Sequence, residues 1–144
     1  MQRTVQQLLE AKEASDVWVV TPDTSVYAAL ELMAEKNIGA VLVVDDGELV
    51  GILSERDYAR KVILLDRGSK DTAVAEIMSP HPLTVAPEAT TGECMQLMTD
   101  NRFRHLPVMH GTRAIGLVSI GDVVRAVIDE QQFLIDQLEG YITQ

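Results

Sequence analysis

The amino-acid sequence predicts an α/β (α+β) fold of two β-α-β-β-α repeats, in which small mixed sheets are flanked by helices. Three observations predict it. The chain matches itself without a gap when shifted by 65 residues, with 11 identities over the 44 positions 20–63. Apolar residues make up 47% of the 144 residues, which is enough to bury a core. Finally, GILSERD (51–57) returns as GLVSIGD (116–122), each ahead of an apolar helical pattern. Self-similarity of this kind governs the fold prediction.

In repeat one, residue types and their spacing predict each strand, helix and turn in order. Runs rich in Val and Leu predict strands, and Pro22 ends the first of them. Apolar residues at helical spacing predict the helices. Asp45-Asp46-Gly47 is typical of a hairpin turn. In order, the expected elements are a strand over 17–20, a helix over 26–36, strands over 40–44 and 49–53, and a helix over 57–65.

Repeat two copies this order, with a turn at His110-Gly111-Thr112. Its expected elements are strands over 83–85, 106–109 and 114–119, and helices over 91–101 and from about 121. TVQQLL (4–9) and AVAEIM (73–78) predict a helical turn ahead of each repeat. We therefore divide the chain into an N-terminal helical segment (1–16), repeat one (17–66), a linker with lead-in helix (67–79), repeat two (80–129) and a helical tail (130–144). Packing both repeats about a pseudo-twofold axis would bury both sheet faces.

Composition limits the classes of function. The formal net charge is −10, and such a chain repels nucleic acid and anionic membranes unless its basic residues cluster. Cys94 is the only cysteine, which excludes an intrachain disulfide and fits a reducing compartment. No signal sequence opens the chain, and no apolar run approaches membrane-spanning length. We therefore expect a soluble, cytoplasmic protein with neither nucleic acid nor membrane as a partner.

The repeated motif has two interpretations. Ser54-x-x-Asp57 and Ser119-x-x-Asp122 both resemble a capping box with Asp in place of the usual Glu. Alternatively, they bind a ligand: an aspartate can accept two hydrogen bonds from vicinal ribose hydroxyls, and a helix N-terminus favours an anion. The glycine of each motif favours the second interpretation, because glycine permits close approach to the backbone. Both roles can coexist.

These features together resemble the tandem CBS-domain (Bateman) module. The likeness rests on the repeat itself, on RHLPV (104–108) and on the G-h-h-S/T-x-x-D ending of each repeat, where h is aliphatic, and it runs from about Thr4 to Asp129. SERDYARK (54–61) is similar to small stand-alone bacterial CBS pairs. The resemblance implies that adenine nucleotides such as AMP, ATP or NAD bind in clefts between the repeats. It implies a regulatory sensor of energy or redox state in signal transduction.

The resemblance also implies roles for particular residues. It assigns Asp57 and Asp122 to ribose, and Ser54 and Ser119 to nearby polar contacts. The candidates for phosphate binding are Arg56, Arg60, Arg104, His105 and Arg125. The implied base pockets use Thr21, Thr24, Ala29 and Leu49, with Ile38, Gly39 and Ala40, for the Asp122 cleft, and Thr84, Ala89, Cys94 and Ala114 for the Asp57 cleft. Because Gly121 replaces Arg56 in repeat two, we expect the two clefts to be unequal.

Two other classes of function are possible for such a sequence: an enzyme and an assembly module. Catalysis has little support, because Cys94 lies in an apolar helical stripe where a buried thiol is typical, and no metal or phosphate-loop motif is present. We therefore expect neither an enzyme, nor a metal, nor a catalytic cofactor. An assembly module without a ligand has better support. Its tail places apolar residues at helical spacing over about 20 residues (~30 Å), which predicts a homodimer that regulates a further, unknown protein. The residues at this spacing are Val124, Val127, Ile128, Leu134, Ile135, Leu138 and Tyr141, with Phe133 and Ile142 beside them.

Overall fold

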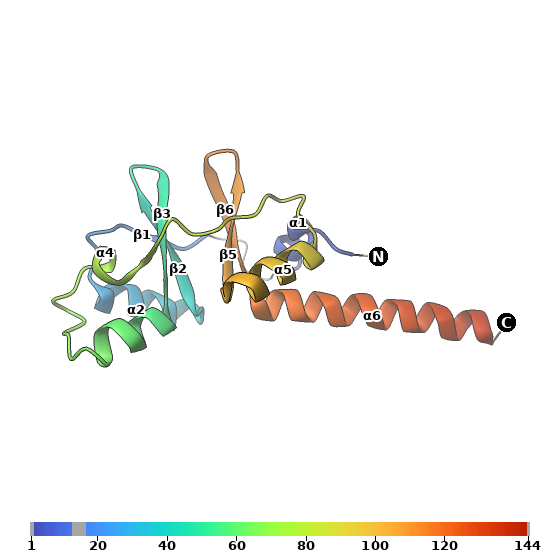
Figure 1. The fold of residues 1–144 in the computed structure, drawn as a ribbon. Helices are drawn as coiled ribbons and strands as arrows, with labels where there is room; N and C mark the ends of the chain where they lie inside the picture. Colours follow the sequence, from blue (N-terminus) through green and yellow to red (C-terminus); the bar gives the residue numbers. More distant parts are fainter. Residues whose placement is uncertain (1, 13–16, 144) are drawn as a thin grey trace. The chain divides into compact units, whose positions relative to one another are not determined.

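The computed structural model describes residues 2–12 and 17–143, and it confirms a mixed α/β fold with small sheets flanked by helices (Figure 1). The chain divides into two compact units. Unit 1 comprises Met1–Asp16, Thr84–His110 and Ile115–Gln144, and unit 2 comprises Val17–Leu83 and Gly111–Ala114. The predicted N-terminal segment therefore lies partly outside the described residues. The segment boundaries inferred from the sequence stay predictions.

Unit 2 contains a four-stranded mixed sheet of order β1-β2-β3-β4, in which β1 and β2 are parallel and the other neighbours antiparallel. Asp46 and Gly47 close the β2–β3 hairpin with φ of 51° and 81°, so the predicted turn is confirmed. The elements are β1 (Val19–Val20), α2 (Val26–Lys36), β2 (Ala40–Asp45), β3 (Glu48–Ser54), α3 (Glu55–Tyr58), a π-helical turn (Ala59–Ile63), α4 (Val74–Ile77) and β4 (Ser79–Pro80).

Two expectations for unit 2 are corrected. The first strand covers only Val19–Val20 rather than 17–20. The helix expected over 57–65 instead starts at Glu55, because the Ser54 hydroxyl accepts a hydrogen bond from the Asp57 N–H and caps its first turn. The helix then widens into a π-helical turn that ends at Ile63. Arg56 therefore lies in the α-helical part of this segment, and Arg60 lies in its π-helical turn.

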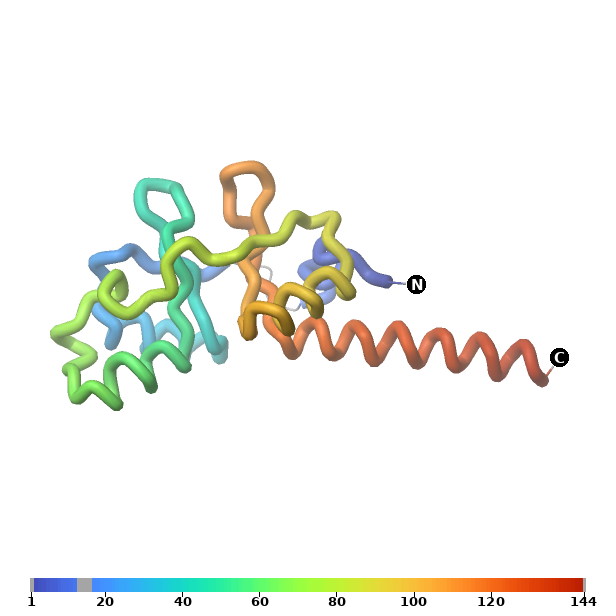
Figure 2. The backbone as a smooth tube through the Cα atoms, in the orientation of Figure 1, coloured from blue at the N-terminus to red at the C-terminus, as the bar shows by residue number. Residues whose placement is uncertain are grey.

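Unit 1 pairs β5 and β6 in a two-stranded sheet. The strand expected over 83–85 is wrong: Val85 makes only an isolated parallel bridge to Val108. Pro82 and Pro87 flank this segment, and a proline has no N–H to donate to a longer ladder. The elements of this unit are α1 (Val5–Glu10), α5 (Thr91–Asn101), β5 (His105–His110), β6 (Arg113–Ser119, whose first two residues count with unit 2) and α6 (Ile120–Ile142). Figure 2 shows α6 continuing well past the rest of its unit.

Each lead-in helix completes the core of the repeat to which it is not adjacent in sequence. Val5 and Leu8 of α1 are buried in the unit 1 core, together with α5, β5 and α6 residues. Val74 and Ile77 of α4 are buried in the unit 2 core. The backbone contacts repeat as well, since Val5 N donates to Ala89 O at 2.8 Å and Val74 N donates to Thr24 O at 2.8 Å. The same construction therefore serves both units.

The motif glycines make room for these lead-in segments. A Cβ at Gly51 would lie 2.5 Å from Met78 Sδ and 3.0 Å from the Ser79 carbonyl oxygen. A Cβ at Gly116 would lie 2.7 Å from Leu9 Cδ2. The group that approaches each glycine is therefore a side chain of the protein itself. This corrects the argument that took the glycines as a sign of a ligand.

Gly51→Ala is expected to destabilise the protein by about 1–3 kcal/mol, since a backbone carbonyl limits how far the packing can adjust. Gly116→Ala should destabilise the protein less than Gly51→Ala does, because only the flexible end of Leu9 has to move. Gly140→Ala is the matched control: nothing lies within 4 Å of its added Cβ, and it should stabilise α6 by about 0.5–1 kcal/mol. Urea denaturation measures all three. An unchanged midpoint for Gly51→Ala would show that the close packing is not needed.

Candidate functional site

In unit 2 the motif forms a group that we call the Asp57 cluster, made of Ser54, Asp57, Lys61 and Ser79. Ser54 N donates to Asp57 Oδ2 at 3.0 Å, and Asp57 N donates to Ser54 Oγ at 3.2 Å. Ser79 Oγ lies 3.4 Å from Asp57 Oδ1. The capping-box interpretation is thus confirmed for this repeat. The Asp57 side chain is 14% exposed, so it is largely but not completely buried.

Lys61 supplies a cation to this cluster. Its Nζ lies 3.6 Å from Asp57 Oδ1 and donates to the Ile77 carbonyl oxygen at 3.1 Å. Lys61 was not among the site residues predicted from the sequence. Its spacing of four residues from Asp57 was the signal that could have found the pair.

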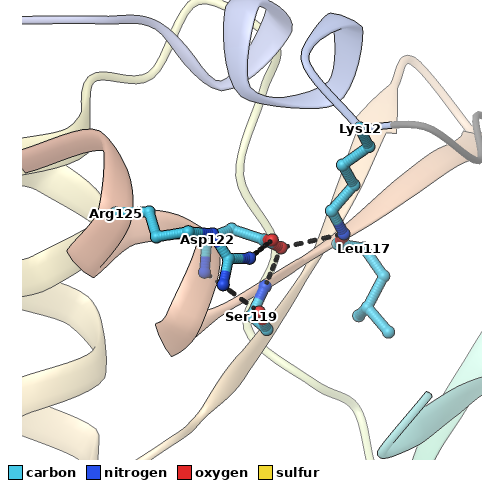
Figure 3. Close-up of polar contacts among 5 residues, drawn as sticks. All are labelled: Lys12, Leu117, Ser119, Asp122 and Arg125. Carbon is cyan, nitrogen blue, oxygen red and sulfur yellow. Dashed lines mark hydrogen bonds and ion pairs between the residues drawn. The ribbon is translucent and has the colours of Figure 1, made fainter. Parts of the chain in front are cut away.

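In unit 1 the equivalent group is the Asp122 cluster, made of Lys12, Ser119, Asp122 and Arg125 (Figure 3). Ser119 N donates to Asp122 Oδ2 at 2.8 Å, and Asp122 N donates to Ser119 Oγ at 3.2 Å. The capping box is therefore present here too, at the start of α6. The Asp122 side chain is 9% exposed. Both motifs therefore hold their carboxylates in the same way.

Two cations converge on the Asp122 carboxylate, as Figure 3 shows. Lys12 Nζ lies 2.8 Å from Oδ2, and Arg125 donates to Oδ1 at 3.0 Å. Burial pushes the pKa of Asp122 upward, but hydrogen bonds from Lys12 and Ser119 and the charge of Lys12 outweigh it, so the pKa lies below its ordinary value. Asp122 is therefore ionised at neutral pH. Lys12 was not predicted from the sequence, because no local pattern marks a partner 110 positions away.

The arginine candidates lie near the two clusters to different degrees. Arg56 and Arg60 are exposed on the segment that follows Ser54. The Arg104 carbonyl oxygen accepts the Ile120 N–H at 2.8 Å, which places Arg104 beside the start of α6. His105 is the first residue of β5. The phosphate roles of these residues stay predictions.

The base-pocket candidates fall into exposed and buried groups. Thr21 and Thr24 form a hydroxyl pair 2.9 Å apart ahead of α2, and Thr21 also bonds Asp23. Gly39 accepts the Glu55 N–H at 3.1 Å, so the segment 38–40 adjoins the Asp57 cluster within unit 2. Thr84 is exposed on unit 1.

Cys94, a further base-pocket candidate, lies in the interior of unit 1. It is completely buried in the unit 1 core, and burial, helped by the neighbouring charge of Glu93, raises the pKa of its thiol. Ala29 is equally buried in unit 2. A fully buried side chain offers no surface to a nucleotide, so Cys94 does not fit the predicted base pocket in this structure. The alternative of a structural thiol fits its position.

Other kinds of site have weaker support in the described residues. No group of three or more His, Cys, Asp and Glu side chains within 2–12 and 17–143 could hold a metal ion. A surface depression of about 460 Å³ in unit 1 is lined by Thr4, Gln6, Pro87, Glu88, His110 and Ile115. This lining includes no member of the Asp122 cluster. The two aspartate clusters therefore remain the candidate site.

Comparison with known proteins identifies the class. A family model for the CBS domain matches residues 11–64 and 74–129, and the chain therefore belongs to the CBS-domain family as a tandem pair. The family resemblance drawn from the sequence is confirmed. The chain is a CBS-pair regulatory module. None of the helices that the structure describes is long and apolar enough to span a bilayer.

The chain is similar to individual CBS-domain proteins over most of its length. The chain is 45% identical to the mitochondrial CBS domain-containing protein CBSX3 of Arabidopsis thaliana, over 96% of this chain and 71% of that protein. It is 53% identical to a protein with CBS domains from Burkholderia ambifaria MC40-6, with a TM-score of 0.85 over 90% of this chain and 96% of the other. It is 31% identical to CBSX2, which was crystallised in complex with AMP, with a TM-score of 0.72 over 89% and 98% of the two chains.

Proposed function

We propose that the protein is a non-catalytic sensor that binds an adenine nucleotide of the AMP, ATP or NAD type. The observation that carries the proposal is the pair of aspartates, each fixed by a serine at a helix start in both repeats. The AMP complex of CBSX2 supports the choice of ligand class. Through this ligand the module would report energy or redox state to a protein that it regulates.

The chemistry of each cluster fits part of a nucleotide. A carboxylate that is fixed by hydrogen bonds from the backbone and a serine can also accept hydrogen bonds from the two hydroxyls of a ribose. The N-terminus of the 23-residue helix α6 adds positive dipole for a phosphate in unit 1, where Arg104 and Arg125 lie near. Arg56 and Arg60 offer positive charge in unit 2. On a chain of net charge −10, such local cations would decide where a phosphate binds.

Thermal unfolding tests this proposal directly. AMP, ATP or NAD at about 100 times its dissociation constant should stabilise the folded protein by about 2.7 kcal/mol and raise its melting temperature. CMP and GMP serve as controls for the base. Native mass spectrometry of the purified protein would identify a co-purifying nucleotide. An unchanged melting temperature with all three adenine nucleotides would reject the proposal.

A second candidate function is assembly, and the exposed half of α6 favours it. All residues from Gln131 to Thr143 are exposed, whereas Glu130 still bonds Arg3 N and Thr91. An isolated helix as short as this exposed half of α6 is only marginally stable in water, which argues that a partner covers it. Its large apolar side chains are between 46% and 79% exposed: Phe133, Leu134, Ile135, Leu138, Tyr141 and Ile142.

We infer that the partner is a second copy of this chain. Leu134, Leu138 and Tyr141 continue the three-four spacing of Val124 and Val127, which is the pattern of helices that pack on one another. Asp129 and Asp136 lie on the opposite side of the helix from this stripe by their spacing. Two copies could therefore pair their stripes without bringing these charges together. A homodimer formed in this way would persist without nucleotide.

Leu134→Asp is expected to convert the dimer to a monomer, because it places a charge in the centre of the stripe. Phe133→Asp is the matched control: Phe133 and Leu134 are 52% and 53% exposed, but Phe133 points away from the stripe. Light scattering coupled to size exclusion measures the mass of each. A wild-type monomer, or equal loss of the dimer in both variants, would contradict self-association through this stripe.

The cysteine content of the chain bears on its cellular compartment. A single buried cysteine suits a reducing compartment, and we propose the cytoplasm on that basis. The name of the Arabidopsis relative CBSX3 places that relative in mitochondria. Fractionation of cells with an antibody against the native protein would decide between the two.

A further inference from the structure

Lys12 occupies the position at which a ligand would have to bind Asp122. Its Nζ lies 2.8 Å from Asp122 Oδ2 and donates to the Leu117 carbonyl oxygen at 2.6 Å. The residue directly follows α1 and its C-cap Ala11, so the contact joins the N-terminal part of the chain to the start of α6. The Lys12 side chain is 33% exposed, so it has space to move away from the Asp122 carboxylate.

A count of acceptor positions shows the consequence. Each carboxylate oxygen has about two lone-pair sites. Asp122 Oδ2 accepts from Ser119 N at 2.8 Å and faces Lys12 Nζ at 2.8 Å, so both of its sites are used. Oδ1 accepts from Arg125, which leaves one site. A pair of ribose hydroxyls needs one free site on each oxygen, and Oδ2 has none while Lys12 stays.

The Asp57 cluster differs at this point. Lys61 Nζ lies 3.6 Å from Asp57 Oδ1, which is longer than a hydrogen bond, and Ser79 Oγ lies 3.4 Å from the same oxygen. Ser54 alone fills Oδ2, through its N–H at 3.0 Å and its hydroxyl at 3.1 Å. The serine hydroxyl can rotate to another acceptor, whereas an ammonium is a fixed charge. Asp57 is therefore the more available carboxylate.

We propose that Lys12 is an internal competitor for the ribose at Asp122, which makes the Asp122 cluster the weaker of two nucleotide sites. The proposal rests on the proposed nucleotide function and deepens it. A nucleotide that binds at Asp122 displaces the Lys12 ammonium from the carboxylate. The inequality of the two sites thus comes from this lysine as well as from the exchange of Arg56 for Gly121.

The test is Lys12→Met in an Asp57→Glu background, which leaves Asp122 as the ribose site to be measured. Calorimetry with adenosine isolates the competition, because adenosine has no phosphate for Lys12 to attract. Adenosine affinity should rise about three- to tenfold, as expected when a partly exposed ion pair no longer competes. The gain for AMP should be smaller. Lys12→Gln, which keeps a donor for the Leu117 carbonyl, guards against a folding defect and should show the same direction.

The matched control is Lys61→Met in an Asp122→Glu background. Its effect on adenosine affinity should stay below about twofold, since the 3.6 Å pair at Asp57 competes weakly. A purely structural role for Lys12 would lower the melting temperature without raising affinity, and that result would overturn the proposal. If the wild-type protein binds neither adenosine nor AMP, the nucleotide function fails and the competition with it. If it binds both and Lys12→Met changes nothing, only the role of Lys12 fails.

Discussion

Asp57→Glu and Asp122→Glu should each lower the nucleotide affinity of one site by about ten- to hundredfold, while the helix starts remain intact. Glutamate is the usual residue at this position of a capping box, so the serine keeps its partner. Its extra methylene moves the carboxylate by about 1.5 Å and misplaces the hydrogen bonds to the ribose. Each such bond to a charged group contributes about 1.5–3 kcal/mol. Calorimetry with AMP should show one site lost in each variant.

The control for this pair is Glu93→Asp, the reverse change at a helix start that belongs to neither cluster. Thr90 Oγ1 accepts the Glu93 N–H at 3.2 Å and caps α5. This variant should bind AMP like the wild type. If both aspartate variants also bind AMP like the wild type, the motifs serve only as helix caps.

Ile77→Ala should destabilise unit 2 by about 2–5 kcal/mol, although Ile77 lies next to repeat two in the sequence. The residue is 1% exposed and packs in the unit 2 core, so its truncation leaves a cavity there. Trp18, the only tryptophan, packs against the same core and reports the unfolding of this unit by fluorescence. The measurement is the urea midpoint followed at Trp18.

Leu8→Ala is the matched variant, because Leu8 holds the same position in α1 that Ile77 holds in α4. Leu8 packs in the unit 1 core. Leu8→Ala should shift the urea midpoint followed at Trp18 less than Ile77→Ala does. It should also shift the urea midpoint that circular dichroism reports for the whole chain. The opposite order at Trp18 would contradict the assignment of α4 to unit 2.

Local patterns in the sequence were sufficient for most of the fold. Helices over 26–36 and 91–101 were predicted to the residue, because a capping serine or threonine and a clear apolar stripe define both. The strand over 83–85 was not predictable in the same way. Its residues favour a strand, but the flanking prolines prevent a full ladder with β5. The capping boxes were open to prediction because both partners lie within four residues.

Contacts between distant segments were beyond the sequence. Nothing near Gly51 or Gly116 indicates that Met78 and Leu9 fill the space beside them. In the same way, Lys12 has no neighbour in the sequence that marks it as the partner of Asp122. Periodicity reports which face a residue takes, whereas the identity of a partner depends on how segments meet after folding. These contacts changed the interpretation of the motif more than any local feature did.

The motif therefore has two structural roles and one proposed role. Ser-x-x-Asp caps α3 and α6, and the glycine makes room for a lead-in side chain. Neither structural role uses all the hydrogen-bond acceptor sites of the carboxylates. What remains on Asp57, and on Asp122 once Lys12 leaves, is the capacity that a ribose would use.

The most direct test of that central claim changes the ligand and leaves the protein intact. Calorimetry would compare AMP with 2′-deoxy-AMP on the wild-type protein under the same conditions. Because the aspartates are proposed to hold both ribose hydroxyls, removal of one should lower the affinity by about ten- to hundredfold. Equal affinities for AMP and 2′-deoxy-AMP would contradict the assignment of Asp57 and Asp122 to the ribose.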